Sequence, residues 1–223
     1  MPLYSADALI LRTYKLGEAD RIVVFLTRDR GKKRGVAKGA RRPRSKFMGG
    51  LEPLTQVRVA YFEKERRELV SVNYSEPSCS PLSADDPEAL GYTEYFAELL
   101  DEWAQDADPD ERLYRLGAAM VDALVAGVAA EPLARYFEYW LLRLQGVYPS
   151  ESGLGLSEEA LAVLSQFRTV NPRRLGELRA TGAALREIES IHRALITAHL
   201  EKEPKSIRVL KDMRRHRAAD GAH

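Results

Sequence analysis

The segment from residue 28 to residue 46 is crowded with cations, although the whole chain has a formal net charge of only +1. Ten of its nineteen residues are Lys or Arg, against the single acid Asp29. Glycines at positions 35, 39, 49 and 50 would let the backbone approach a ligand closely. Side chains of this type neutralise phosphate groups, so the chemistry expected here is electrostatic binding of a polyanion.

We predict that the ligand is DNA, bound through its phosphates and without sequence preference. The residues predicted to contact DNA are Arg12, Lys15, Lys32, Lys33, Arg34, Lys38, Arg41, Arg42, Arg44 and Lys46. Four aromatic residues are candidates to stack on unpaired bases or, alternatively, to fill the core: Tyr14, Phe47, Tyr61 and Phe62. A charge run can also be a solvated face or protect a strand edge.

Two other classes of binding protein remain open. The basic loop could dock onto an acidic protein partner and never contact nucleic acid. The ligand could also be RNA, because attraction to phosphate does not distinguish the two sugars.

Catalytic and metal-binding patterns are not found in the sequence. No stretch has the spacing of a phosphate-binding NTPase loop, and His192 and His199 lie seven residues apart, whereas zinc-binding histidine pairs are usually four apart. The single cysteine, Cys79, excludes an intrachain disulfide and a cysteine-based metal cluster. We therefore expect no catalytic residue, no metal and no cofactor.

The charges divide the chain into two unlike parts. Residues 1–77 contain 17 basic and 9 acidic residues, which leaves 17 basic and 24 acidic residues for the rest. The proline- and serine-rich stretch that follows is typical of a linker. We predict a nucleic-acid-binding domain over 1–77, a linker over 78–87, an α-helical domain over 88–212 and a flexible tail over 213–223.

The basic part is predicted to be a small β-barrel. Four short segments rich in β-branched and aromatic residues predict strands over 7–14, 20–27, 56–62 and 68–74. A fifth strand is expected within the glycine-containing segment 31–40. Five strands in so short a stretch favour the five-stranded oligonucleotide-binding (OB) barrel.

The acidic part is predicted to be a helical bundle, which makes the fold class α+β with two domains. Four acid-or-amide residues directly precede proline, a pattern that marks helix starts at prolines 87, 109, 132 and 172. Asp108 with Glu111 also matches a capping box. Apolar residues at spacings of three and four between 133 and 144 predict a core helix.

The chain has no apolar run long enough to span a membrane, and its first fifteen residues lack the features of a secretory leader. We expect a bacterial cytoplasmic, nucleoid-associated protein with no membrane partner.

The stretch 8–54 resembles the RecO family of bacterial recombination mediators. The likeness is carried by Tyr14, Gly17, Glu18, Asp20, Thr27, Gly31, "VAKGARR" at 36–42, Ser45 and "LEPL" at 51–54. A looser likeness covers "YFEYWLLRLQGVYP" at 136–149 and "HLEKEPKSIRVL" at 199–210. The resemblance implies an OB barrel joined to a helical domain, in a non-enzymatic DNA repair protein that binds single- and double-stranded DNA and anneals complementary strands.

The resemblance also implies protein partners. These are RecR, the acidic C-terminal tail of single-strand-binding protein, and RecA indirectly, because the family helps RecA replace single-strand-binding protein on DNA. The tail would bind the helical domain, for which Arg135, Tyr139 and Arg143 are the candidate residues. Many relatives carry a four-cysteine zinc motif where this chain has "YPSESGLGLSE", so structural zinc is not expected here.

Overall fold

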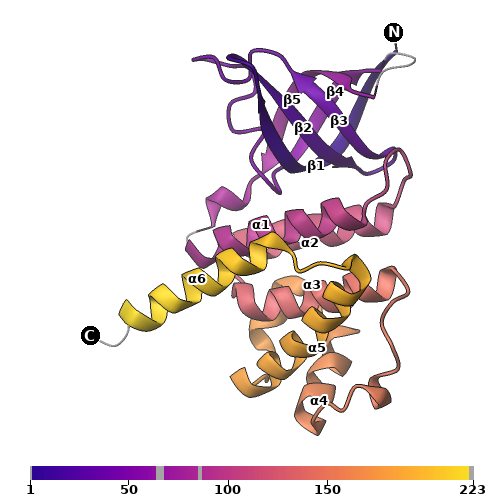
Figure 1. Cartoon of the computed structure of the whole chain (residues 1–223), viewed down its shortest axis with the longest axis vertical. Helices are drawn as coiled ribbons and strands as arrows, with labels where there is room; N and C mark the ends of the chain where they lie inside the picture. Colours follow the sequence, from indigo (N-terminus) through magenta and orange to yellow (C-terminus); the bar gives the residue numbers. More distant parts are fainter. Residues whose placement is uncertain (1, 64–67, 85–86, 221–223) are drawn as a thin grey trace.

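The computed structural model describes residues 2–63, 68–84 and 87–220. It places five strands at the N-terminal end of the chain and helices after them (Figure 1). The strands are β1 (Leu3–Leu16), β2 (Asp20–Thr27), β3 (Gly31–Ala37), β4 (Gln56–Phe62) and β5 (Val70–Cys79). Figure 1 shows the strands at one end of an elongated molecule and helices α4 and α5 at the other.

The strands form a closed barrel in the order β1-β2-β3-β5-β4, which confirms the predicted five-stranded fold. All neighbours are antiparallel except β3 and β5, which pair in parallel through residues 35–37. The long strand β1 pairs with β4 through its first half and with β2 through its second half. A register shift between Ile10 and Arg12 interrupts its pairing with β2, a feature that bends a strand and helps a small barrel to close.

Six α-helices and three short 3₁₀ turns follow in the described part of the chain. The helices are α1 (Pro87–Trp103), α2 (Glu111–Val125), α3 (Ala130–Leu144), α4 (Glu158–Phe167), α5 (Gly182–Leu200) and α6 (Lys205–Asp220). The turns are η1 (Pro81–Ser83), η2 (Glu151–Gly153) and η3 (Pro172–Glu177). The predicted α+β fold class is therefore confirmed.

The predicted helix starts agree with the structure to different degrees. Helix α1 begins at Pro87, and the Asn171 side chain accepts a hydrogen bond at the start of η3, as expected. Helix α2 is capped by Asp110 instead of Asp108: its carboxylate accepts from the backbone N–H groups of residues 112 and 113. Helix α3 begins at Ala130 without a side-chain cap, two residues before the start predicted at Pro132.

Two predicted irregular segments are more ordered than expected. Within the predicted linker, β5 continues to Cys79 and the Ser80 hydroxyl caps η1, while the acids at 85 and 86 lie outside the described residues. Within the predicted tail, α6 is helical as far as Asp220. Helix α6 packs against α1 so closely that a Cβ on Gly91 would lie 2.6 Å from the Met213 sulfur.

The barrel and the helices share one hydrophobic core. Leu9 and Leu26 on the barrel belong to the same buried cluster as Leu100 of α1 and Leu124 of α2. Gly117 of α2 lies so close to β1 that a Cβ there would be 2.6 Å from the Leu9 side chain. A second cluster, which includes Phe25 and Tyr61, fills the barrel interior. The two parts are therefore packed against each other directly.

Candidate nucleic-acid interface

The candidate interface centres on the basic loop, residues 38–55, which joins β3 to β4. Its start is fastened to the turn between β1 and β2. The Arg41 backbone N–H donates to the Ala19 carbonyl at 2.9 Å, and its guanidinium donates to the Gly17 carbonyl at 2.8 Å. The Gly39 N–H donates to the Asp20 carboxylate at 2.8 Å. Residues 17 and 39 both have positive φ, 58° and 72°, which glycine adopts without strain.

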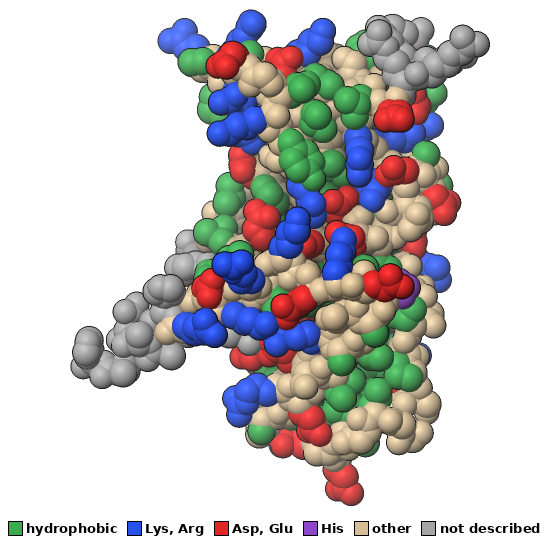
Figure 2. All heavy atoms as spheres, in the orientation of Figure 1, with side chains coloured by type: hydrophobic (Ala, Val, Ile, Leu, Met, Phe, Trp, Pro, Cys, Tyr) green, Lys and Arg blue, Asp and Glu red, His purple; other side chains and the backbone are tan. Residues whose placement is uncertain are grey.

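A groove of about 400 Å³ lies along this loop. Four arginines line it: Arg21, Arg41, Arg42 and Arg44. Met48 also lines the groove, and 73% of its surface is exposed. Figure 2 shows Lys and Arg side chains on the outer end of the barrel, and others over the helices. Cations beside exposed apolar surface can accept phosphate together with the face of a base.

Six of the ten predicted DNA contacts have exposed side chains in positions open to a ligand: Lys15, Arg34, Lys38, Arg41, Arg42 and Arg44. In the described part of the chain, no acidic side chain forms an ion pair with any of them. Lys46 is exposed too, and its ammonium donates to the Asn73 side chain at 3.4 Å. These seven exposed cations therefore carry no ion pair with an acid among the described residues.

The other three predicted contacts form ion pairs within the protein, which the sequence-based expectation did not include. The Lys32 ammonium donates to the Asp101 carbonyl at 2.7 Å and lies 3.3 Å from the Asp101 carboxylate, with its side chain only 10% exposed. The Arg12 guanidinium lies 3.3 Å from the same carboxylate. Lys33 pairs with Glu63 at 2.8 Å. Lys32 and Arg12 thus hold the barrel on α1.

The candidate stacking residues also separate by burial. Tyr14 is exposed on β1 and its hydroxyl accepts from Arg12, whereas Phe47 and Tyr61 are buried in the barrel. Burial raises the pKa of Tyr61 to about 12. Tyr74 of β5 is exposed as well, because a register shift in the β4–β5 pairing interrupts the alternation that would otherwise place it on the same face as the buried Val72.

Two of the glycines expected to admit a ligand serve the barrel itself. A Cβ on Gly35 would lie 2.7 Å from both Val70 and Val72 of β5, and one on Gly50 would lie 2.6 Å from the Ser75 carbonyl oxygen. Around Gly49, in contrast, no heavy atom lies within 4 Å of such a Cβ. Gly35 and Gly50 therefore allow close packing within the fold.

In the helical part, Arg135 is buried, which corrects its expected role on a docking surface. Its guanidinium pairs with Glu138 at 2.8 Å and with Glu189 at 3.3 Å. Glu138 also accepts from Tyr95 and lies 3.1 Å from the His192 ring. Burial lowers the pKa of His192 despite the neighbouring carboxylate. Arg135 thus belongs to a polar cluster in the core.

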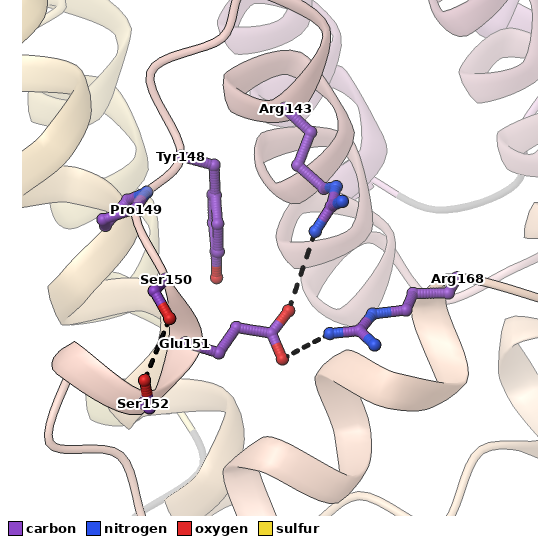
Figure 3. A pocket seen from close by; sticks show the side chains of 7 residues that line it. All are labelled: Arg143, Tyr148, Pro149, Ser150, Glu151, Ser152 and Arg168. Atoms are coloured by element: carbon purple, nitrogen blue, oxygen red, sulfur yellow. Dashed lines mark hydrogen bonds and ion pairs between the residues drawn. The ribbon is translucent and has the colours of Figure 1, made fainter.

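Arg143, in contrast, lines a surface pocket together with Arg168 (Figure 3). The Tyr139 ring is buried, and its hydroxyl accepts from Arg143 at 3.1 Å and from Arg168 at 3.2 Å. The pocket has a volume of about 460 Å³ and is lined by Arg143, Tyr148, Pro149, Ser150, Glu151, Ser152 and Arg168. The segment expected to replace a cysteine motif therefore forms one wall of this pocket.

Two other kinds of feature are absent from the described residues. No helix among them is long and apolar enough to cross a membrane. No group of three or more metal-ligating side chains lies together in the same ranges. His199, one of the two histidines considered, stacks on Trp103 with ring centroids 5.3 Å apart, whereas His192 lies in the core cluster.

Comparison with known proteins gives similarity to one family along the whole chain. The profile "Recombination protein O N terminal" matches residues 1–80, and "Recombination protein O C terminal" matches residues 84–152. Two relatives named DNA repair protein RecO match over nearly their full length. The protein from Pelotomaculum thermopropionicum is 29% identical over 100% of this chain and 99% of the relative. The protein from Desulforudis audaxviator is 30% identical over 96% of this chain and 98% of the relative.

A third relative of the same name, from Koribacter versatilis, is 42% identical, but the match covers 66% of this chain and 60% of that protein. The stronger likeness is thus confined to part of the chain, whereas the weaker ones extend from end to end. Because a relative at 30% identity is matched along nearly all of both chains, the chain belongs to the recombination protein O (RecO) family.

Proposed function

We propose that this chain binds DNA through its barrel and acts as a recombination mediator in DNA repair. In this role it anneals complementary strands and helps RecA load onto single strands coated by single-strand-binding protein. The partners are single- and double-stranded DNA, RecR and the C-terminal tail of single-strand-binding protein, with RecA engaged indirectly. The protein acts without catalysis, in the bacterial cytoplasm.

The observation that carries the proposal is the fastened basic loop with its exposed, unpaired cations. Hydrogen bonds from Arg41 and Gly39 hold the loop against the β1–β2 turn, so these cations are presented on a defined surface. Binding a phosphate releases condensed counterions, and the affinity does not depend on the base. Neutralised strands repel one another less, which favours annealing.

The helical part is proposed to dock protein partners. Residues 78–223 carry 24 acids and 17 bases, a balance that disfavours contact with a DNA strand. Of the three residues expected to hold the acidic tail, Arg143 lines the surface pocket, and Arg168 lines it too. The Tyr139 side chain is buried, and its hydroxyl accepts from both arginines. We therefore propose Arg143 and Arg168 as the docking residues, with Tyr139 orienting them.

Strand annealing tests the proposal. Two complementary oligonucleotides, one with a fluorophore and one with a quencher, are mixed with the full-length chain. We expect the chain to accelerate quenching, and the variant Arg34→Ala/Lys38→Ala/Arg42→Ala to lose most of this acceleration. The matched control is Arg28→Ala/Arg58→Ala, which removes two exposed barrel arginines that pair with Glu111 and Asp7. Equal rates for the triple variant and the wild type would refute the role of these exposed cations of β3 and the basic loop.

A second arm compares DNA with RNA. Unlabelled DNA and RNA strands of equal length and sequence compete for the bound fluorescent strand. We expect DNA to compete at least as well as RNA. A clear advantage for RNA would favour the alternative of an RNA-binding barrel.

A further inference from the structure

Glu151 occupies a position between two arginines in the surface pocket (Figure 3). Its carboxylate lies 2.6 Å from the Arg168 guanidinium and 3.8 Å from that of Arg143. Both arginine side chains are nearly half exposed, whereas only 17% of the Glu151 side chain is exposed. The acid thus lies inside a site whose positive walls remain open to solvent.

The two arginines are oriented by a group other than Glu151. The Tyr139 hydroxyl oxygen accepts a hydrogen bond from each of them, at 3.1 and 3.2 Å. Its ring is fixed in the core by contacts with the rings of Trp140, Tyr148 and Phe167. Because the Tyr139 oxygen already accepts two hydrogen bonds, its hydroxyl proton is left to donate. The hydroxyl donates to the Glu151 carboxylate, at a distance of 3.5 Å between the oxygens.

Three donors therefore converge on one carboxylate from well-supported elements. Arg143 lies in the last turn of α3, and Arg168 directly follows α4. Glu151, in contrast, is carried by η2, a three-residue turn in the connection between these helices. A turn of this length moves more easily than the packed helices, so the acid is the replaceable member of the cluster.

We propose that Glu151 is the chain's own occupant of the carboxylate position in this pocket, and that an acidic peptide must displace it to bind. This inference rests on the proposed function, in which Arg143 and Arg168 dock the acidic tail of a protein partner. Arginine pairs fit carboxylates well, because the planar donors can bond both oxygens. A DNA strand fits less well, because many phosphates would have to approach the acidic surplus of residues 78–223.

Peptide binding to the full-length chain tests the competition. The probe is a fluorescein-labelled peptide, Asp-Asp-Leu-Phe with a free C-terminal carboxylate, and its uncharged counterpart is Asn-Asn-Leu-Phe amide. We expect fluorescence anisotropy to show binding of the acidic peptide only. Glu151→Gln should bind the acidic peptide about fivefold more tightly than the wild type does. The substitution removes the Glu151 carboxylate as a competitor, and its ion pairs stabilise the closed pocket about as much as one exposed ion pair would. Arg143→Ala and Arg168→Ala should each weaken binding about tenfold.

The matched control is Glu177→Gln, which breaks a similar exposed pair with Arg174 at 2.6 Å, outside the pocket. We expect it to bind the peptide like the wild type. The proposal is overturned if neither the wild type nor Glu151→Gln binds, if Glu151→Gln gains no affinity, or if Glu177→Gln gains as much. Displacement of the peptide by an excess of single-stranded oligonucleotide would overturn it too, since the pocket would then be a phosphate site.

Oligonucleotide binding by the same variants separates this proposal from the proposed function. Glu151→Gln and Arg168→Ala should bind DNA like the wild type, because both residues lie in the helical part. Loss of the peptide effect with normal DNA binding would refute only the competition by Glu151. Failure of the wild type to bind or anneal DNA would refute the DNA-binding part of the proposed function and leave the peptide result standing.

Discussion

At the scale of single residues, the spatial partner of each cation decides its role. Lys32 and Arg34 are two positions apart in β3, yet Lys32 is enclosed by Asp101 and the α1–α2 connection, whereas Arg34 is exposed. The excess of cations over residues 28–46 can be read from the sequence. Which of these cations form ion pairs cannot, because the acids that pair with Lys32 and Lys33, Asp101 and Glu63, are 30 or more residues away along the chain.

We predict that Lys32→Ala destabilises the protein by about 3 kcal/mol, because it leaves the Asp101 carboxylate, whose side chain is only 11% exposed, with Arg12 as its remaining partner. Urea unfolding followed by circular dichroism measures this change. The control Lys15→Ala, an exposed lysine on β1, should change the free energy of unfolding by less than about 0.5 kcal/mol. Similar small effects of both substitutions would show that Lys32 is not structural.

At the scale of elements, the strands were easier to predict than the last helix. Alternating β-branched residues directly indicate strands such as β2 and β4. Helix α6 has few apolar residues, and its first turn is held by an acid from another helix. Glu98 of α1 accepts from the backbone N–H groups of Lys205 and Ser206 and from the Ser206 hydroxyl. No local pattern reports such a cap.

This cap predicts a pH dependence. Burial alone would raise the pKa of Glu98, but the hydrogen bonds from Ser206 and Lys205 outweigh it and lower that pKa. A lowered folded-state pKa gives stability that is complete above the unfolded value of about 4.3 and is lost as the pH falls through the folded value. We expect Glu98→Gln to be less stable than the wild type at pH 7, by a margin that shrinks below about pH 4.3. Urea unfolding at several pH values measures it; a constant margin would contradict the cap.

At the scale of the whole molecule, the barrel and the helices are one packed body. Charge composition separates a basic from an acidic part of the chain, but it could not show that Leu9 and Leu26 of the barrel are buried in one cluster with residues of α1 and α2. The backbone of the α1–α2 connection also bonds β3: the Lys32 N–H donates to the Gln105 carbonyl at 3.2 Å, and the Ala107 N–H donates to the Lys32 carbonyl at 3.0 Å. Contacts between parts depend on side-chain fit in three dimensions, which periodicity does not encode.

We predict that Gly117→Ala destabilises the protein by about 1 to 3 kcal/mol, because the new methyl group would overlap Leu9 and Leu100 at 2.6 and 2.7 Å. Hydrogen exchange should show faster opening both in β1 and in α2. As a control, Gly153→Ala adds a methyl group in open space and should have little effect. Faster exchange in α2 alone would show that the two parts open independently.

The central claim is that the exposed cations of the barrel bind the phosphates of a DNA strand. The salt dependence of affinity for a fluorescent single-stranded oligonucleotide tests it most directly, in the wild type and in Arg34→Ala/Lys38→Ala/Arg42→Ala. We predict that log K falls steeply with log salt in the wild type, and that the slope becomes about 2 units shallower in the variant as three phosphate contacts are lost. An unchanged slope with tight binding would place the DNA elsewhere, and no binding at low salt would contradict the claim altogether.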